Sequence, residues 1–227
     1  MLDTFRKKIA SVFVKPYLTW YLGKERRTHL KGFDLLIKPS VFHPKYFFSS
    51  TYLFDFVNKL ELRNKSFLEI GSGSGIISLL AFRKGAHVTS VDINPVAIEC
   101  TTYNFKVNFK EPHNREFKAI ESDIFSALAP GVFDYIAINP PYFFENAELK
   151  SQLAWNCGKN GEYFTQLFSQ LGRYVSKDSS VYMILADNCD LNRIETIAKQ
   201  YHYRLKTVEK KKIKWETNFI YSILPQI

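Results

Sequence analysis

Cysteine, clustered metal ligands and long apolar runs are all scarce in this sequence. The 227 residues include only three cysteines, and their wide separation, with no Cys-x-x-Cys pair, excludes a disulfide framework and a cysteine zinc site. The five histidines show no metal-ligand spacing. No apolar run reaches the about 20 residues that a membrane-spanning helix needs, and Asp3, with no small-residue cleavage site, argues against a signal peptide. These absences predict a metal-free, cytoplasmic protein that does not enter a membrane.

The composition is that of a folded α/β chain. Hydrophobic residues make up 46% of the sequence, which is enough to fill a single core at this length. No internal repeat or low-complexity segment is seen. We expect a basic N-terminal extension over residues 1–50, with a helix, a strand and an entrance loop, followed by the main domain over residues 51–227.

The net charge of +9 is concentrated at the two ends of the chain. Residues 1–45 carry ten Lys/Arg against three Asp/Glu, and residues 199–227 carry seven against two. If both ends fold onto one face, they would form a surface that attracts phosphates. The alternative is that these lysines are solvated and keep the protein soluble. Residues 1–14 have the spacing of an amphipathic helix, which would either pack on the domain or anchor it to RNA or a membrane.

The sequence Asn-Pro-Pro-Tyr follows a short apolar strand at residues 133–138. Two prolines cannot continue a strand, so the strand ends at Asn139. The Asn139 side-chain oxygen and the Pro140 carbonyl are then free to accept hydrogen bonds from the two N–H bonds of a planar NH2 group. Tyr142 would stack on that plane, as aromatic rings do on nucleobases. The alternative is a polar strand end and a proline turn.

A glycine-rich turn joins a buried strand at residues 66–70 to an apolar helix at residues 76–82. Such a turn lets a ligand approach the backbone and directs helix N–H groups towards it. A dinucleotide-binding turn would have glycine at position 76, where this chain has Ile76. The motif therefore favours a ligand without a pyrophosphate, and its members are Glu69, Gly71, Gly73 and Gly75.

Polar residues stand at the ends of three successive strands. Asp92 follows the strand at residues 87–91, Asp123 follows the strand at residues 117–122, and Asn139 follows the next strand. The carboxyl ends of parallel strands meet at one edge of the sheet, where such folds bind ligands. A carboxylate in the first of these positions can accept hydrogen bonds from both ribose hydroxyls. Singly, each carboxylate could equally be a surface charge.

The remaining pattern alternates helices and strands and then changes at the C-terminus. Strand-like runs at residues 204–213 and 219–224 are separated by five residues, too few for a crossover helix, which predicts an antiparallel hairpin. Further expected elements are a strand at 32–37, a helix capped by Ser49-Ser50-Thr51 and running through Leu60, a strand at 180–186, and helices at 95–109, 161–174 and 191–201.

A parallel sheet closed by an antiparallel hairpin, carrying these motifs, resembles the class I S-adenosylmethionine-dependent methyltransferases. More narrowly it resembles the small HemK-like methyltransferases, which share the Asn-Pro-Pro-Tyr motif. The resemblance covers about residues 33–224. It implies an α/β, Rossmann-like fold with a seven-stranded, mostly parallel sheet and a C-terminal antiparallel hairpin, and S-adenosyl-L-methionine as the cofactor.

The resemblance also implies which residues hold the cofactor. Asp92 would hold the ribose and Ile93 would pack on the adenine. Asp123 and the backbone of Ile124 would bind the edge of the adenine, and Asn139 would border the cofactor as well. The glycine turn would contribute Glu69, Gly71, Gly73 and Gly75, the first three as a wall against the methionine part.

On the acceptor side, the resemblance implies that Asn139 and Pro140 hold the nitrogen to be methylated while Tyr142 stacks on its plane. Residues 41–44 match the entrance loop of the family, and residues 155–164 resemble a glycine-containing segment that follows the motif. One departure concerns the N-terminus. Full-length glutamine methyltransferases carry a separate helical domain before the glycine turn, and only about 65 residues stand there in this chain.

The preferred hypothesis is an S-adenosylmethionine-dependent N-methyltransferase that modifies an exocyclic amine of adenine or guanine in RNA. The alternative is a protein-glutamine N5-methyltransferase that acts on a translation factor or ribosomal protein. A lesser alternative is a methyltransferase-fold protein that binds without catalysis. Ile76 and the terminal hairpin disfavour a nicotinamide dehydrogenase.

Overall fold

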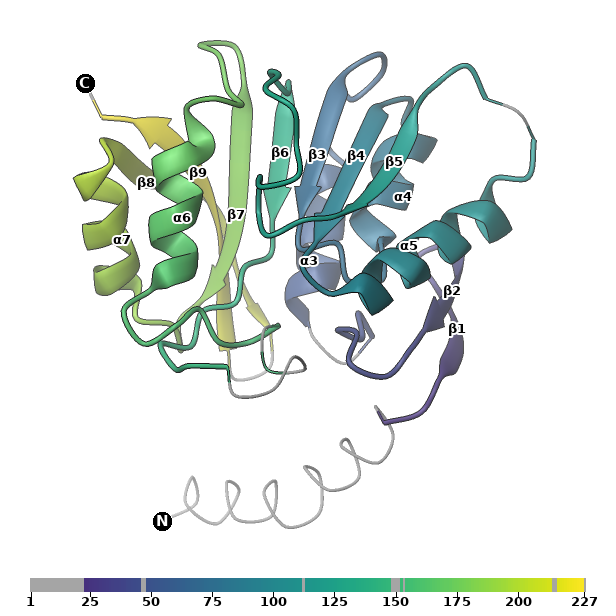
Figure 1. Cartoon of the computed structure of the whole chain (residues 1–227), viewed down its shortest axis with the longest axis horizontal. Coiled ribbons are helices and arrows are strands. Elements are labelled where there is room, and N and C mark those ends of the chain that lie inside the picture. Colours follow the sequence, from purple (N-terminus) through teal and green to yellow (C-terminus); the bar gives the residue numbers. More distant parts are fainter. Residues whose placement is uncertain are drawn as a thin grey trace.

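A computed structural model of the chain describes residues 23–45, 48–111, 113–147, 152, 154–213 and 216–226. The amphipathic helix expected at residues 1–14 lies outside these described residues. The described elements form a two-stranded sheet and a seven-stranded sheet with helices on both faces of the larger one (Figure 1).

The large sheet has the strand order β5-β4-β3-β6-β7-β9-β8. Its first five strands are parallel, and β9 runs antiparallel to both β7 and β8. This arrangement confirms the expected fold class. The strands are β3 (Ser66–Ile70), β4 (His87–Asp92), β5 (Phe117–Glu121), β6 (Tyr135–Ile138), β7 (Ser180–Ala186), β8 (Tyr203–Ile213) and β9 (Glu216–Pro225).

The central strands are apolar because both of their faces are covered, as is typical of parallel sheets. One face carries α3 (Phe48–Val57), α4 (Ile76–Arg83) and α5 (Pro95–Asn108), and the other carries α6 (Glu162–Leu171) and α7 (Leu191–Gln200). In Figure 1, α6 and α7 lie in front of the sheet and α4 lies behind it. Each face has its own cluster of buried side chains.

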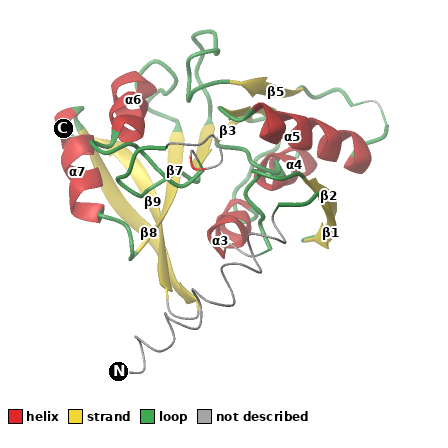
Figure 2. Ribbon diagram, turned by 60° about the horizontal axis from the view of Figure 1, so that its bottom comes forward, coloured by secondary structure: helices red, strands yellow, loops and turns green. Residues whose placement is uncertain are grey.

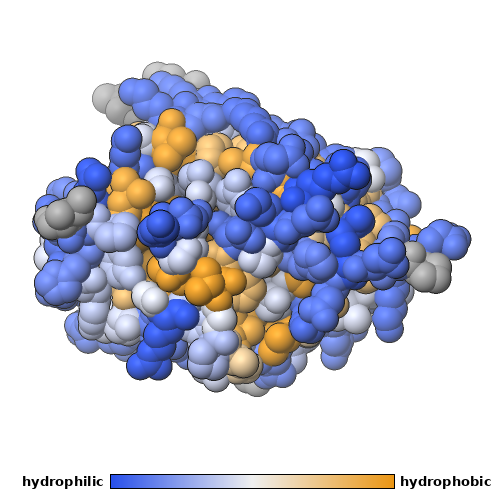
Figure 3. Space-filling view, turned by 90° about the horizontal axis from the view of Figure 1, so that it is seen from above, coloured by the Kyte–Doolittle hydropathy of each residue, from blue (hydrophilic) through white to orange (hydrophobic). Residues whose placement is uncertain are grey.

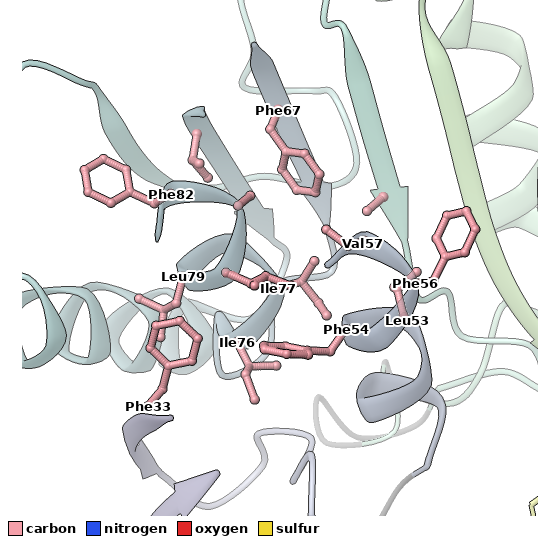
Figure 4. Close-up of a cluster of buried hydrophobic side chains, with 14 of the residues drawn as sticks. Phe33, Leu53, Phe54, Phe56, Val57, Phe67, Ile76, Ile77, Leu79 and Phe82 are labelled. Atoms are coloured by element: carbon pink, nitrogen blue, oxygen red, sulfur yellow. The ribbon is translucent and has the colours of Figure 1, made fainter. Parts of the chain in front are cut away.

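The cluster beneath α3 and α4 fixes the position of α3 at the sheet (Figure 4). Leu53, Phe54 and Val57 of α3 are buried against Ile77 of α4. The ring of Phe54 also meets that of Phe33 edge-on, with 6.3 Å between centroids. The first turn of α3 is thereby held at the carboxyl edge of the large sheet.

The strand expected at residues 32–37 is present as β2 (Phe33–Ile37), and it pairs with a strand that was not predicted, β1 (Arg26–Leu30). The small sheet is held on α5 by two side-chain amides. Asn104 accepts from the Leu36 N–H at 2.7 Å and donates to the Leu36 carbonyl at 3.0 Å. Asn108 makes the same pair of contacts with Asp34. The two amides therefore substitute for a neighbouring strand along the open side of β2.

Most helices begin within two residues of the expected positions. The exception is α3, which already contains Ser49 and Ser50 in its first turn and ends at Val57. The expectation that Ser49-Ser50-Thr51 caps this helix is wrong. The Thr51 hydroxyl donates instead to the Phe48 carbonyl at 3.0 Å, within the helix.

The edge of the sheet at the amino ends of the parallel strands has an ordinary polar surface. Seen from above the view of Figure 1, it is largely hydrophilic, with hydrophobic residues in separate groups (Figure 3). Within the described ranges, no helix is long and apolar enough to cross a bilayer.

Candidate active site

The carboxyl ends of β3, β4, β5 and β6 open into a cavity of about 680 Å³. Figure 2 turns this edge towards the viewer and shows the loops that follow the strands gathered there. The structure brings ten of the predicted site residues into the lining: Glu69, Gly71, Gly73, Asp92, Ile93, Asp123, Ile124, Asn139, Pro140 and Tyr142.

The glycine turn lies tightly against the neighbouring strands. The N–H groups of Gly71 and Ser72 both donate to the Val91 carbonyl, at 2.9 and 3.0 Å. Gly71 has a φ of 79°, in the left-handed region, and a Cβ there would lie 3.4 Å from the Asn139 carbonyl. Glycine at this position therefore lets the turn and the acceptor motif approach each other.

Gly75, the last glycine of the motif, is not among the cavity residues. It precedes α4 with a φ of 76°, and a Cβ on it would lie 2.8 Å from the Thr101 side chain of α5. The structure therefore places Gly75 at a packing contact between α4 and α5, where the sequence pattern suggested contact with a ligand.

Asp92, the last residue of β4, is held by two backbone donors. Its Oδ2 accepts from Gly73 N at 2.8 Å, and its Oδ1 accepts from Asn94 N at 2.9 Å. Burial raises the pKa of Asp92, and these two hydrogen bonds oppose the rise. Each carboxylate oxygen keeps a further lone pair for a ligand. Beside it, Ile93 is 41% exposed, which presents an apolar surface on the cavity rim.

Glu69 is bound to the helix that follows its strand. Its Oε2 accepts from Ser78 N at 2.9 Å and also accepts from the Ser78 hydroxyl. Only 5% of Glu69 is exposed, and burial raises its pKa to about 8. The carboxyl group thus ties β3 to α4 at the base of the cavity.

The turn after β5 combines an exposed carboxylate with an unusual backbone. Asp123 is exposed, and its N–H donates to the Ser126 hydroxyl at 3.1 Å. Ile124 has a φ of 51°, which a β-branched residue seldom adopts and which costs conformational energy. The Ser122 hydroxyl stabilises this turn, because it donates to the Ile124 carbonyl at 3.1 Å and accepts from Ala127 N at 3.0 Å.

Asn139 follows β6 directly and is oriented by α3. Its side-chain nitrogen lies 3.4 Å from Ser49 Oγ and 3.3 Å from Ser50 Oγ, with the amide assigned as donor. Within the described part of the chain, neither the Asn139 side-chain oxygen nor the Pro140 carbonyl accepts a hydrogen bond. Both acceptors therefore remain available at the cavity, as the motif predicted.

Tyr142 is fixed through its backbone. The N–H groups of Tyr142 and Phe143 both donate to the Trp155 carbonyl, at 3.0 and 2.9 Å. The Tyr142 ring is half-buried in the cavity wall and meets the Phe143 ring at 4.9 Å. Burial raises the pKa of Tyr142, so its hydroxyl stays protonated at neutral pH.

Two loops far apart in the sequence meet at the cavity. The rings of Phe42 and Trp155 lie 5.0 Å apart, and both residues line the cavity. The Asn94 side-chain nitrogen also donates to the Ser40 carbonyl at 3.1 Å, which ties the loop before α3 to the start of α5. His43 of this loop is buried, with 1% of its surface exposed. The family resemblance matched this loop to an entrance loop, whereas the residues alone fitted packing as well as ligand contact, and the contact with Trp155 was not predicted.

Sequence reasoning also missed Ser49 and Ser50, whose roles depend on where α3 packs, and Tyr163 at the start of α6, which lines the cavity. The only signal for Tyr163 was its place in a segment that resembles part of the family.

The cavity residues suit S-adenosylmethionine better than a phosphate-bearing ligand. Asp92, Asp123 and Glu162 line it, and no Lys or Arg is among the described lining residues. Tyr163 also lines the cavity, and its buried hydroxyl has no hydrogen-bond partner among the described residues. Carboxylates favour a cationic ligand such as a sulfonium and repel phosphate. Within the described ranges, no cluster of three metal-ligating side chains is found.

A Rossmann-like sheet with an acidic cavity at its carboxyl edge and an Asn-Pro-Pro-Tyr turn on the rim defines a class I S-adenosylmethionine-dependent methyltransferase. The family model described as Methyltransferase small domain matches residues 33–164, and the chain belongs to this family.

Two relatives by sequence bear names that differ in the methyl acceptor. A protein of Methanocaldococcus jannaschii, named as a candidate protein N5-glutamine methyltransferase, is 33% identical over 161 residues, which are 68% of this chain and 77% of that protein. A tRNA1(Val) (adenine(37)-N6)-methyltransferase of a Flavobacteriaceae bacterium is 32% identical over 92 residues, 40% of this chain and 38% of that enzyme. The match thus spans well under half of the second relative.

A solved structure supports the same fold. The T. thermophilus 16S rRNA N2 G1207 methyltransferase, in complex with AdoMet and guanosine, superposes with a TM-score of 0.58 and 17% identity, covering 88% of this chain and 50% of that one. At this identity the likeness concerns the fold alone. With the family match, the chain is an S-adenosylmethionine-dependent methyltransferase.

Proposed function

We propose that this enzyme transfers a methyl group to a planar NH2 group held by Asn139 and Pro140, and that the acceptor is an exocyclic amine of adenine or guanine in RNA. S-Adenosylmethionine would lie along Gly71, Gly73 and Asp92. The observation that supports this most directly is the pair of unused acceptors beside the cavity, at the Asn139 side chain and the Pro140 carbonyl.

When bound, S-adenosylmethionine supplies a methyl group already activated on a sulfonium. The enzyme's own task is to orient the nitrogen and to stabilise the positive charge that grows on it. A hydrogen bond to a charged group contributes roughly 1.5–3 kcal/mol. The two acceptors together would contribute on the order of 10²–10⁴ in rate. Alignment of the two reactants can supply a further ~7–11 kcal/mol. No general base is needed, because the methylated cation is acidic.

The case for RNA comes from the cations beside the acceptor site. Lys211 pairs with Asn218, which pairs in turn with Ala186, the last residue of β7. Lys211 and the adjacent Lys212 therefore lie at the carboxyl edge, and both are exposed. The Lys211 Nζ lies 5.8 Å from the centroid of the Tyr52 ring, on the same helix α3 that carries Ser49 and Ser50. Lysines in this position could contact phosphates next to a splayed base.

A glutamine side chain is the second candidate acceptor, because its amide presents the same planar NH2. The observation in its favour is the relative from Methanocaldococcus jannaschii, whose match spans far more of both proteins than the match to the tRNA enzyme. The lysines of the β8–β9 hairpin would then dock a protein partner.

Methyl transfer into two pools separates these candidates. Labelled S-adenosylmethionine is incubated with the enzyme and with total RNA or total protein, both from cells that lack the gene. We expect label in RNA, at one modified base, with binding that weakens steeply as salt is raised. Label confined to one protein band would assign the enzyme to glutamine instead, and no transfer to either pool would contradict both proposals.

A further inference from the structure

Tyr163 carries a buried hydroxyl that pairs with nothing in the described part of the chain. It is the second residue of α6, it lines the cavity, and its hydroxyl has no hydrogen-bond partner among the described residues. Its position is well defined, because its N–H donates to the Cys157 carbonyl at 3.0 Å and its ring meets that of Phe164 edge-on at 5.4 Å. A buried polar group in a folded protein costs free energy unless it is paired.

Tyr174 shows what the same side chain does when its role is structural. Its hydroxyl donates to the carbonyls of Leu128 and Phe125, at 3.2 and 3.4 Å. Both tyrosines pack in or against the cluster under α6 and α7. Of these two hydroxyls, that of Tyr163 has no partner among the described residues.

The surroundings of Tyr163 point to the ligand's nucleoside half. Burial raises the pKa of this tyrosine, and the charges of Asp92 and Asp123 add to the rise, so the hydroxyl stays protonated and lies within the field of both carboxylates. These are the two residues assigned to the ribose and to the adenine edge. A protonated phenol is a good donor to a ring nitrogen or a ribose oxygen.

We propose that Tyr163 positions S-adenosylmethionine by donating a hydrogen bond from its hydroxyl to an acceptor atom of the adenosine moiety. This inference rests on the proposed cofactor site. It gives a role to the polar hydroxyl of a side chain that packs against the apolar cluster under α6 and α7. It also implies that the unpaired hydroxyl costs stability in the free enzyme and becomes satisfied on binding.

The test compares Tyr163→Phe with Tyr174→Phe, which removes the same atom from a paired hydroxyl. Calorimetric titration with S-adenosylhomocysteine and with 5′-methylthioadenosine, which lacks the amino-acid part, measures binding without turnover. We expect Tyr163→Phe to raise the dissociation constants of both ligands about 3- to 10-fold, the loss expected for one hydrogen bond between neutral groups. Its unfolding midpoint without ligand should stay the same or rise. Tyr174→Phe should lower the midpoint and leave both affinities unchanged.

Unchanged affinity in Tyr163→Phe would overturn the inference, as would a loss of affinity for S-adenosylhomocysteine alone. A wild-type protein that binds neither ligand would overturn the proposed cofactor site as well, so the two failures are distinguishable.

Discussion

Single side chains at the carboxyl edge are fixed by hydrogen bonds that use only part of their capacity. Asp92 accepts from Gly73 and Asn94, and Asn139 is directed by two serine hydroxyls. In both cases the bonds to the protein set the orientation and leave lone pairs for a ligand. Such groups are ready for binding before the ligand arrives, which reduces the cost of ordering them.

The positions of Asp92, Asp123 and Asn139 follow from the sequence, because each ends a strand of a readable βα pattern. Their partners do not follow from it. The contact of Asn139 with Ser49 and Ser50 joins positions about 90 residues apart and depends on the tilt of α3. The left-handed backbone conformation of Ile124 likewise cannot be predicted from its residue type.

Replacing Asp92 tests the ribose assignment. Asp92→Ala removes the acceptors for the ribose hydroxyls. The binding free energy of S-adenosylhomocysteine should weaken by about 1.5–3 kcal/mol, so its dissociation constant should rise on the order of 10- to 100-fold. Calorimetric titration measures this, with Asp178→Ala on an exposed turn as the control. Unchanged affinity in a folded Asp92→Ala protein would remove Asp92 from the ribose site.

At the scale of elements, apolar packing places polar groups where chemistry needs them. The cluster between α3 and α4 holds the first turn of α3 against the end of β6. The paired strands β8 and β9 carry lysines to the same edge. Helix and strand identities were readable from periodicity, whereas β1 was missed because Arg26–Leu30 is polar and half-exposed, with no apolar alternation. The contact of Asn104 with β2 was not predicted either, because an asparagine in the middle of a helix is normally a surface residue.

The α3 contact should affect turnover more than binding. In a Ser49→Ala/Ser50→Ala double variant, the Asn139 amide loses the two hydroxyls that orient it. The single-turnover rate of methyl transfer should then fall about 10-fold, because the loss of one hydrogen bond raises the activation free energy by roughly 1.4 kcal/mol. The dissociation constant of S-adenosylhomocysteine should stay within about two-fold. Thr51→Ala, on the same helix with a hydroxyl bonded to Phe48, is the control and should keep the wild-type rate. Equal rates in both variants would show that α3 does not orient Asn139.

At the scale of the whole molecule, the two halves of the sheet carry different groups at the carboxyl edge. Strands β3, β4 and β5 end at the acidic part of the cavity, where we propose that the cofactor binds. Strand β6 ends at the Asn-Pro-Pro-Tyr turn, and the terminal hairpin carries exposed lysines. This division was predictable from the order of motifs along the chain. The meeting of Phe42 with Trp155 was not, because it closes two loops over the cavity through tertiary packing alone.

Burial of Glu69 should make the stability of the whole molecule depend on pH. Its pKa rises from an ordinary value of 4.5 to about 8 on folding. Between these values the folded chain holds a proton that the unfolded chain has lost. Stability is therefore full below pH 4.5 and falls as pH rises towards 8, by up to about 1.4 kcal/mol per pH unit.

In Glu69→Gln this contribution is absent, so the decline with pH should be shallower. Urea unfolding of both proteins from pH 5 to pH 9 measures the difference. If the free energy of unfolding changes with pH in the same way for both proteins, Glu69 is ionised in the folded protein.

The central claim is that Asn139 holds the acceptor nitrogen and does not hold the cofactor in place. The most direct measurement is therefore a pair of values for Asn139→Ala: the dissociation constant of S-adenosylhomocysteine and the rate of methyl transfer to whichever pool the wild type labels. We expect the affinity to stay within a few-fold of wild type and the rate to fall about 10- to 100-fold, because one of the two hydrogen bonds to the developing charge, worth roughly 1.5–3 kcal/mol, is lost. A variant that transfers methyl groups at the wild-type rate, or one that no longer binds S-adenosylhomocysteine, would contradict this role.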